Sequence, residues 1–186
     1  MIIQSGDVAC HLFFLSKGNV KYYRVTDRGE ERILGWLAPG DVFGLATLLK
    51  NPPGYIGSAV AEKDSTLWAW EHSSLCSLCT VYPQLSQNAL RITIDCLAAY
   101  VDRHTALTTK SAEERLGHTL LRLGRRAGRT HPEGIDIDIT NEQVGGLADI
   151  GVFTASRLLS KWERQGTISK GRGNIRIHAP ERLLFE

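Results

Sequence analysis

The residues of this 186-residue chain best suited to chemistry are cationic and hydroxyl side chains near its C-terminus, which can donate hydrogen bonds to an acceptor-rich ligand. Arginine can donate two hydrogen bonds to a guanine edge, and lysine, serine and threonine suit phosphates and base edges. Between residues 152 and 165 such side chains lie opposite an apolar stripe with helical spacing. The polar face carries Thr154, Ser156, Arg157, Ser160, Lys161 and Arg164, and the stripe carries Ala155, Leu158, Leu159 and Trp162. Taken alone, the stretch also fits an ordinary helical hairpin with a solvated basic face.

A shorter helix is expected just before this one. Thr140 followed by Gln143 forms a capping box, in which each side chain bonds the backbone amide of the other residue. We expect Gly151 to supply the freedom in φ that a sharp turn between two helices needs, and Gly166 to end the second helix. The apolar side of the first helix is then formed by Val144, Leu147 and Ala148. Two helices joined in this way form the helix-turn-helix pattern.

A β-hairpin is predicted after the second helix. Residues 167–170 and 175–178 alternate in polarity around the glycine-containing turn at 171–174. From residue 154 to residue 182 there are seven basic and two acidic residues, a net charge of +5, whereas the whole chain carries only +2. The positive charge is therefore concentrated beside the polar helix, which is typical of a winged DNA-binding domain.

The N-terminal part of the chain is predicted to form short strands. Runs at 12–15, 20–25, 32–37, 56–61 and 65–71 are separated by turns, with one or two helical turns at 42–49. This spacing predicts an antiparallel sandwich or barrel.

A long helix is predicted over residues 84–109. Its apolar seam has spacings of 4, 3, 4, 3 and 4, which is a heptad pattern and predicts packing on a partner helix. The alternative is a helix packed on its own domain; we favour a parallel dimer, because a twofold-symmetric reader of DNA half-sites needs one. The seam consists of Leu90, Ile94, Leu97, Val101 and His104, followed by Thr108. A further helix at 110–128 ends in an arginine cluster that suits a helix C-terminus. The predicted domains are therefore a β-roll at 1–83, a dimerisation helix at 84–109 and a winged helix-turn-helix at 110–186.

Composition limits the other classes. No run approaches the length of a membrane helix, and the N-terminus has no secretory pattern, so we expect a cytoplasmic protein. Cys76 and Cys79 have CxxC spacing without a second such pair, which favours core cysteines over a metal or redox site. The six histidines are scattered, so no metal site is predicted.

With both halves read, the chain resembles the CRP/FNR family of bacterial transcription regulators over nearly all of its length. The resemblance is carried by residues 15–20 and 37–44, by Arg115-Leu116 with residues 119–123, and by the helix-turn-helix and wing. It implies an α+β fold with an N-terminal antiparallel, jelly-roll-like β-roll. It also implies a homodimer on a roughly palindromic double-stranded operator, an effector sensed by the roll, RNA polymerase as a partner, and no enzymatic activity.

The chain departs from the cyclic-AMP-binding members of the family. Leu45 stands where they have a glutamate for the ribose, and their Arg-Ser phosphate pair falls near Ile56 and Gly57. Their base-contacting residues fall near Tyr100 and Val101. Without an arginine, a phosphate would lack its charge-assisted bonds, so we predict no cyclic-nucleotide binding. The pocket would hold an apolar or flat ligand, or side chains would fill it; its candidate residues are Phe43, Gly44, Leu45, Ala46, Ile56, Gly57, Leu97, Tyr100 and Val101.

Two further departures concern the sensor. The chain lacks the N-terminal cysteine cluster that holds iron–sulfur in FNR-type oxygen sensors. It also lacks the segment that usually precedes the first strand, which we interpret as a misassigned start or a trimmed chain. No cofactor is evident, although a haem-dependent gas sensor stays open, with His11 and His104 as candidate ligands.

The predicted DNA contacts combine both arguments. Arg157 would read a guanine, with Thr154 and Ser156 completing the base contacts. Phe153 stands where the family often has a glutamate, and could contact a thymine methyl, so the operator half-site should differ from TGTGA or TTGAT at one base pair. Gln143 belongs to the contacting set, and phosphates would be held by Thr140, Lys161, Lys170, Arg172 and Arg176.

Three rival functions remain. A cupin-like metalloenzyme would need a metal cluster on the strands, where only His11 and His72 are present. A thiol sensor would use Cys76 and Cys79. A ligand-free regulator would respond only through its abundance.

Overall fold

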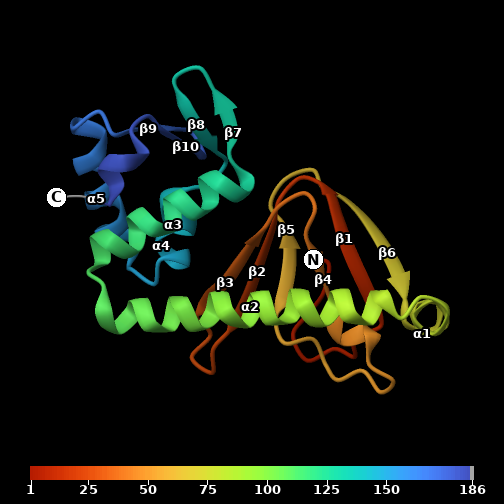
Figure 1. The fold of residues 1–186 in the computed structure, drawn as a ribbon. Helices are drawn as coiled ribbons and strands as arrows, with labels where there is room; N and C mark the ends of the chain where they lie inside the picture. The colour runs from red at the N-terminus through yellow and green to blue at the C-terminus, as the bar shows by residue number, and fades with distance from the viewer. Residues whose placement is uncertain (185–186) are drawn as a thin grey trace. The chain divides into compact units, whose positions relative to one another are not determined.

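The computed structural model describes residues 1–184 and divides the chain into two compact units, Met1–Arg103 and His104–Glu186 (Figure 1). Phe185 and Glu186, the last two residues of the predicted DNA-binding domain, lie outside the described residues. The architecture agrees with the predicted α+β class: antiparallel sheets, a long helix and a C-terminal helix-turn-helix.

The first unit contains two three-stranded antiparallel sheets. One has the order β4 (Val42–Phe43), β1 (His11–Lys17) and β6 (Thr66–Glu71). The other has the order β3 (Glu31–Leu37), β2 (Val20–Val25) and β5 (Ser58–Ala61). A 3₁₀ helix, η1 (Leu45–Leu48), follows β4, and α1 (His72–Val81) follows β6. The alternating segments of the sequence therefore form the predicted strands.

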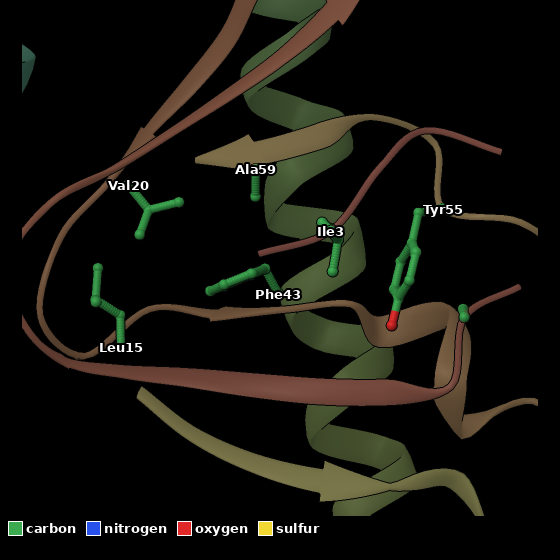
Figure 2. Close-up of a cluster of buried hydrophobic side chains, with 7 residues drawn as sticks. Ile3, Leu15, Val20, Phe43, Tyr55 and Ala59 are labelled. Atoms are coloured by element: carbon green, nitrogen blue, oxygen red, sulfur yellow. The ribbon is translucent and has the colours of Figure 1, made fainter. Parts of the chain in front are cut away.

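The core of this unit lies between the two sheets. Figure 2 shows Leu15 and Phe43 from one sheet pointing toward Val20 and Ala59 from the other. Burial of each large apolar side chain contributes about 1.5–3 kcal/mol. At the edge of this cluster the Tyr55 hydroxyl accepts from the backbone N–H of His11 at 3.0 Å and donates to its carbonyl at 2.9 Å, so the phenol is satisfied where it enters the core.

The long helix α2 (Gln84–Thr109) has the predicted bounds and no buried residue. Four apolar residues of its seam are more than half exposed: Leu90 62%, Ile94 54%, Leu97 62% and Val101 56%. On another face of α2, Arg103 donates from Nη1 to the backbone carbonyl of Ile33 at 2.9 Å. The first unit therefore uses one face of the helix and leaves the seam uncovered.

The second unit begins with α3 (Ala112–Ala127), which starts in a capping box between Ser111 and Glu114. Leu116, Leu120 and Leu123 of α3 are buried. The helix-turn-helix consists of α4 (Asn141–Leu147) and α5 (Val152–Arg164). The 3₁₀ helix η2 (Pro180–Leu183) follows the wing.

The wing is larger than the predicted two-stranded hairpin. It is a four-stranded antiparallel sheet in the order β7 (Arg129–His131), β8 (Gly134–Ile137), β10 (Asn174–Ile177) and β9 (Ile168–Gly171). Residues 132–133 form the turn between β7 and β8. The strand β7 has three largely polar residues, too few to show alternation, which is why the sequence did not reveal it.

The prediction that Gly151 provides an unusual φ in the turn between α4 and α5 was wrong. Gly151 has φ −64°, which any residue can adopt, whereas Asp149 has φ 53°. Aspartate tolerates this left-handed conformation better than most residues. Arg115 holds the turn by donating from Nε to the carbonyl of Ala148 at 3.1 Å and from Nη2 to that of Asp149 at 3.2 Å.

Candidate nucleic-acid interface

The outward face of α5 carries the predicted reading residues. Ala155, Leu158, Leu159 and Trp162 are buried, as the apolar stripe predicted. Their burial fixes the rotation of the helix, so Phe153, 90% exposed, and Arg157 face solvent. Arg157 has no side-chain hydrogen bond or ion pair with any of residues 1–184, and Thr154 and Ser156 are half-buried beside it. The guanidinium of Arg157 and the ring of Phe153 therefore lie one helical turn apart on the exposed face of α5.

The start of α4 is fixed by the predicted capping box. The Thr140 hydroxyl oxygen accepts from the Gln143 amide at 3.2 Å, and the Gln143 side-chain oxygen accepts from the Thr140 amide at 2.9 Å. The hydroxyl still has its own proton to donate, which suits a phosphate oxygen. The cap therefore positions Thr140 without using up its donor.

Three of the predicted phosphate-binding cations are in ion pairs. Lys161 Nζ lies 3.0 Å from Glu113 Oε1, and Lys170 Nζ lies 2.9 Å from Glu163 Oε2. Hydrogen bonding from Lys170 lowers the pKa of the Glu163 carboxyl below its ordinary value. Glu113 lies on α3 and Glu163 lies on α5, so each ion pair joins two different elements and the positive charge of each lysine is shared with an acid.

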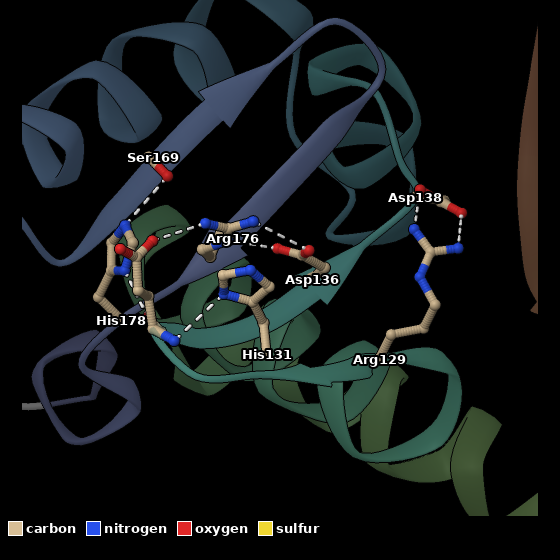
Figure 3. Close-up of polar contacts among 8 residues, drawn as sticks. Arg129, His131, Asp136, Asp138, Ser169, Arg176 and His178 are labelled. Atoms are coloured by element: carbon tan, nitrogen blue, oxygen red, sulfur yellow. Dashed lines mark hydrogen bonds and ion pairs between the residues drawn. The ribbon is translucent and has the colours of Figure 1, made fainter.

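Arg176 is the most strongly engaged of these cations. Its Nε lies 2.6 Å from Asp136 Oδ1, its Nη2 lies 3.2 Å from Oδ2, and its Nη1 lies 2.8 Å from Glu133 Oε2 (Figure 3). Hydrogen bonding to Arg176 lowers the pKa of Asp136, and the same contact raises the pKa of Arg176. Arg176 therefore cross-links β10 to β8 and to the turn that precedes β8.

The same sheet holds two further polar contacts (Figure 3). Arg129 makes a two-bond contact with the Asp138 carboxylate, at 2.8 and 3.0 Å. His178 joins the carbonyl of Glu133, at 2.7 Å, to the hydroxyl of Ser169, at 3.0 Å. Part of the arginine cluster at the end of α3 is thus structural, and the acidic partners could not be found from the sequence because up to 43 positions separate them from their cations.

Arg172 differs from the paired cations. It is exposed at the tip of the β9–β10 hairpin, beside Gly173, whose φ is 78°. Within the described part of the chain, its side chain has no acidic or hydrogen-bonding partner. Together with Arg157 it is therefore available to an incoming polyanion.

The predicted effector-pocket residues differ in burial. Phe43 is buried and Ala46 packs against the same core, whereas Ile56 is 69% exposed. Gly44 has φ 80° and Leu45 begins η1. Gly57 lies under the ring of Tyr22, a residue that sequence reasoning missed, and Leu97, Tyr100 and Val101 are on the exposed surface of α2.

The cysteines and histidines form no metal centre in residues 1–184, where no group of three or more potential ligands comes together. Cys76 Sγ lies 3.5 Å from His72 Nε2 and 3.7 Å from Nδ1. His104 is exposed on α2, and the carbonyl of His11 accepts from Thr47 and Tyr55. No helix within the described residues is both long enough and apolar enough to cross a membrane.

Two family models match the chain. The cyclic nucleotide-binding domain matches residues 1–82, and the Crp-like helix-turn-helix domain matches residues 114–184. The electron transport regulator A of Shewanella oneidensis is 28% identical over 169 residues, which are 90% of this chain and 67% of the relative. The fumarate nitrate reduction regulatory protein of Klebsiella oxytoca is 27% identical over 171 residues, with the same shares.

Solved structures show the same fold. FixK2 from Bradyrhizobium japonicum matches with a TM-score of 0.84 and 25% identity, over 98% of this chain and 89% of that one. A CRP-family transcriptional regulator from Thermus thermophilus matches with a TM-score of 0.81 and 20% identity, over 98% and 92% of the two chains. These matches cover both units of the chain, the β-sheets as well as the helix-turn-helix.

Proposed function

We propose that the protein acts as a homodimer on a palindromic operator. The chain belongs to the CRP/FNR family of transcription regulators, and it is a DNA-binding regulator with an effector-type domain. Each protomer would place its α5 in the major groove of one half-site. The observation that carries the proposal is the pair of exposed, unpartnered side chains on α5, Phe153 and Arg157, opposite a fully buried stripe.

The dimer is proposed from the surface of α2. Leu90, Ile94, Leu97 and Val101 repeat with heptad spacing and are all exposed in the single chain, and exposed His104 continues the row. A row of exposed leucine, isoleucine and valine on one helix is stabilised when a second copy covers it. Parallel pairing of two such helices generates the twofold axis that a palindromic site requires.

The base contacts are proposed to come from four residues of α5. Arg157 donates two hydrogen bonds to a guanine, and the ring of Phe153 packs on a thymine methyl. Thr154 and Ser156 complete the contacts from the same face. Because a phenyl ring accepts no hydrogen bond from cytosine as a carboxylate would, we expect the half-site to differ at one base pair from those of members with a glutamate at that position.

The phosphate contacts are proposed for Thr140, Arg172 and the three paired cations. Arg172 carries a full unshared charge at the wing tip, and Thr140 donates from the start of α4, where Gln143 holds the cap. Lys161, Lys170 and Arg176 contribute less each, since their charge is shared with acids. Backbone contacts of this kind fix the register of the protein on the duplex.

For the remaining parts of the chain we propose the division 1–83, 84–109 and 110–186 into effector roll, dimerisation helix and DNA-binding domain. The roll responds to something other than a cyclic nucleotide, because Ile56 and Gly57 offer no cation to a phosphate. The protein is proposed to work in the cytoplasm with RNA polymerase, as a regulator and not as an enzyme.

Selection of duplexes from a random pool tests the proposal. The purified chain should enrich one motif with two inverted half-sites, and fluorescence anisotropy should give tight binding to that duplex and weak binding to a scrambled one. The protein mass measured by light scattering should be that of two protomers, both before and after DNA is added. A monomer that enriches no motif would refute both parts.

A thiol-responsive regulator of the same fold is the second candidate, favoured by the 3.5 Å contact between Cys76 Sγ and His72 Nε2. The sulfur is almost equidistant from both ring nitrogens, so the contact is poorly directed for proton transfer. Operator binding measured with a reductant and with hydrogen peroxide distinguishes a thiol-responsive regulator from one that does not respond to thiol oxidation. Equal binding under both conditions would remove this candidate.

A further inference from the structure

Arg115, near the start of α3, is hydrogen-bonded to three backbone carbonyl groups. Its Nη1 donates to the carbonyl of Lys110 at 2.9 Å, and its Nε and Nη2 donate to those of Ala148 and Asp149 at 3.1 and 3.2 Å. Lys110 directly follows α2, whereas Ala148 and Asp149 lie in the turn between α4 and α5. One half-buried side chain therefore joins the end of α2 to the turn of the helix-turn-helix, within the compact unit that begins at residue 104.

The connection between α2 and α3, Lys110 and Ser111, is held by further contacts. The amide of Lys110 donates to the carbonyl of Ala106 at 3.0 Å, so the helical bonding of α2 extends to this residue. Lys110 Nζ lies 2.7 Å from His118 Nε2 on α3, and Ser111 starts α3 as the first residue of its capping box. Because these contacts hold the start of α3 on the end of α2, Arg115 donates to the turn from a fixed position.

The turn at the other end of this link is a Schellman motif without glycine at its left-handed position. The amide of Ile150 donates to the carbonyl of Gly145 at 3.0 Å. The amide of Asp149 donates to the carbonyl of Gly146 at 3.3 Å, and Asp149 itself has φ 53°, where glycine is usual. The carbonyl of Asp149 is one that Arg115 binds, so the guanidinium lies at the C-terminal end of α4, where the helix dipole stabilises a cation. Arg115 therefore stabilises a turn whose backbone conformation is unfavourable for its own residue.

Half-site spacing depends on how the helix-turn-helix is attached to α2. In the proposed dimer the two copies of α2 lie along the twofold axis and each α5 enters a groove, so this attachment decides how far apart the two α5 helices lie. We propose that Arg115 is a positioning residue for operator reading: it sets the spacing at which the two α5 helices meet their half-sites. The inference rests on the proposed dimer and operator, and adds the residue that determines their spacing.

A change of spacing in the DNA tests such an attachment. One base pair inserted between the half-sites moves them apart by about 3.4 Å and rotates one against the other by about 35°. A protein in which Arg115 holds the turn to α2 cannot follow this change without breaking contacts, whereas a protein without this link can. Loss of Arg115 should therefore weaken the preference for one spacing and leave the preferred bases of each half-site unchanged.

Competition among duplexes with the selected half-sites at the selected spacing, one base pair shorter and one base pair longer measures this preference. Wild type should bind the selected spacing about tenfold more tightly than the other two, within the usual range of coupling energies. In Arg115→Met, which removes every donor, this ratio should fall below about threefold. Arg125→Met removes an exposed arginine from the same helix and should keep the wild-type ratio. Equal binding of all three spacings by wild type, or an unchanged ratio in Arg115→Met, would overturn the proposal.

Asp149→Gly separates the link from the stability of the turn. Glycine adopts a positive φ without strain, so Arg115→Met combined with Asp149→Gly should melt at a higher temperature than Arg115→Met alone. This double variant also provides a folded protein if Arg115→Met does not fold. Its spacing ratio should stay low, because the bond to the carbonyl of Lys110 is still missing. A wild-type ratio in the double variant would show that Arg115 acts only through the stability of the turn, and would overturn the proposal.

Hydrogen exchange followed by mass spectrometry tests the link without DNA. Exchange should be faster in Arg115→Met at both segments that the side chain joins, 107–111 and 148–151, and addition of Asp149→Gly should slow it again only at 148–151. Faster exchange at one segment alone would show that Arg115 does not link them, and would contradict the proposal. If wild type binds no duplex at all, the proposed function fails, whereas these exchange rates still decide the role of Arg115.

Discussion

The ammonium group of Lys170 lies 2.9 Å from the Glu163 carboxylate, and this pair joins strand β9 of the wing to helix α5 of the helix-turn-helix. The backbone N–H of Lys170 also donates to Glu163 Oε1 at 3.1 Å, and Nζ donates to Ser160 Oγ at 2.9 Å. The wing is therefore held against α5 by three polar contacts from one residue. The same pair shares the positive charge that we propose for a phosphate contact.

Glu163→Gln should release that charge. We expect affinity for random duplex DNA to rise several-fold and the slope of log K against log salt to steepen by about one per protomer, because one more cation can displace a phosphate counterion. Anisotropy titrations at several salt concentrations give both values. Glu181→Gln, which removes an exposed acid from η2, is the matched control; an equal effect there would show that net charge alone is responsible.

Arg157→Ala should weaken binding to the selected operator by about 1–3 kcal/mol and relax selectivity at one base pair of each half-site. The reason is that the guanidinium is exposed, unpaired and placed on the outward face of α5. Competition among duplexes that differ at single positions measures the effect. Equal loss on operator and random DNA would show that Arg157 contacts only phosphate.

Arg172→Ala should weaken operator and random DNA alike, and lower the salt slope by about one per protomer. Arg176→Ala provides the contrast, because Arg176 is bound to Asp136 and Glu133. That variant should lose folding stability and change the salt slope less than Arg172→Ala does. A loss confined to the operator sequence in Arg172→Ala would contradict the phosphate assignment.

The Asp136–Arg176 pair predicts a pH dependence of stability. Because the folded-state pKa of Asp136 is lowered by Arg176, the pair stabilises the fold above the ordinary aspartate pKa, and this contribution is lost as pH falls through the lowered pKa. The stabilities of wild type and Asp136→Asn, measured by urea unfolding, should therefore differ at pH 7, and the difference should shrink as pH falls below the ordinary aspartate pKa of about 3.9. A constant difference across this range would mean that ionisation of Asp136 does not matter.

Leu97→Asp should separate the dimer. A carboxylate in the middle of the seam would be buried without a partner in the paired helices. We expect a monomer by light scattering and a loss of operator affinity of about 10²-fold, since two linked half-site contacts become one. Ala99→Asp, on the opposite side of α2, should remain dimeric; a dimer in both variants would place the interface elsewhere.

Patterns repeated along the chain were sufficient to predict most of the fold. The seam of α2, the buried stripe of α5 and the capping box at Thr140 are set by spacing alone, and the structure has all three. The turn was predicted wrongly because glycine is a general signal for positive φ, whereas Asp149 adopts it here under the hold of Arg115. Such a contact joins positions more than thirty apart and leaves no local pattern.

The sequence predicted which basic residues belong to the candidate site, but not which of them form ion pairs with acids. Basic residues near α5 and the wing were evident, yet only the fold shows that Lys161, Lys170 and Arg176 meet acids while Arg172 does not. Tyr22 shows the same limit in the roll. It packs among Gly35, Gly57 and Ala59, two of which are its cross-strand neighbours, and the sequence does not show that these small residues meet around it.

The central claim is that two copies of the chain, paired along α2, read inverted half-sites through Arg157. Its most direct test is the mass and sequence content of the complex recovered from a random pool of duplexes. We expect two protomers on each duplex and one inverted repeat with a guanine in each half, and we expect Arg157→Ala no longer to select that guanine. Recovery of a single protomer, or of sequences without an inverted repeat, would contradict it.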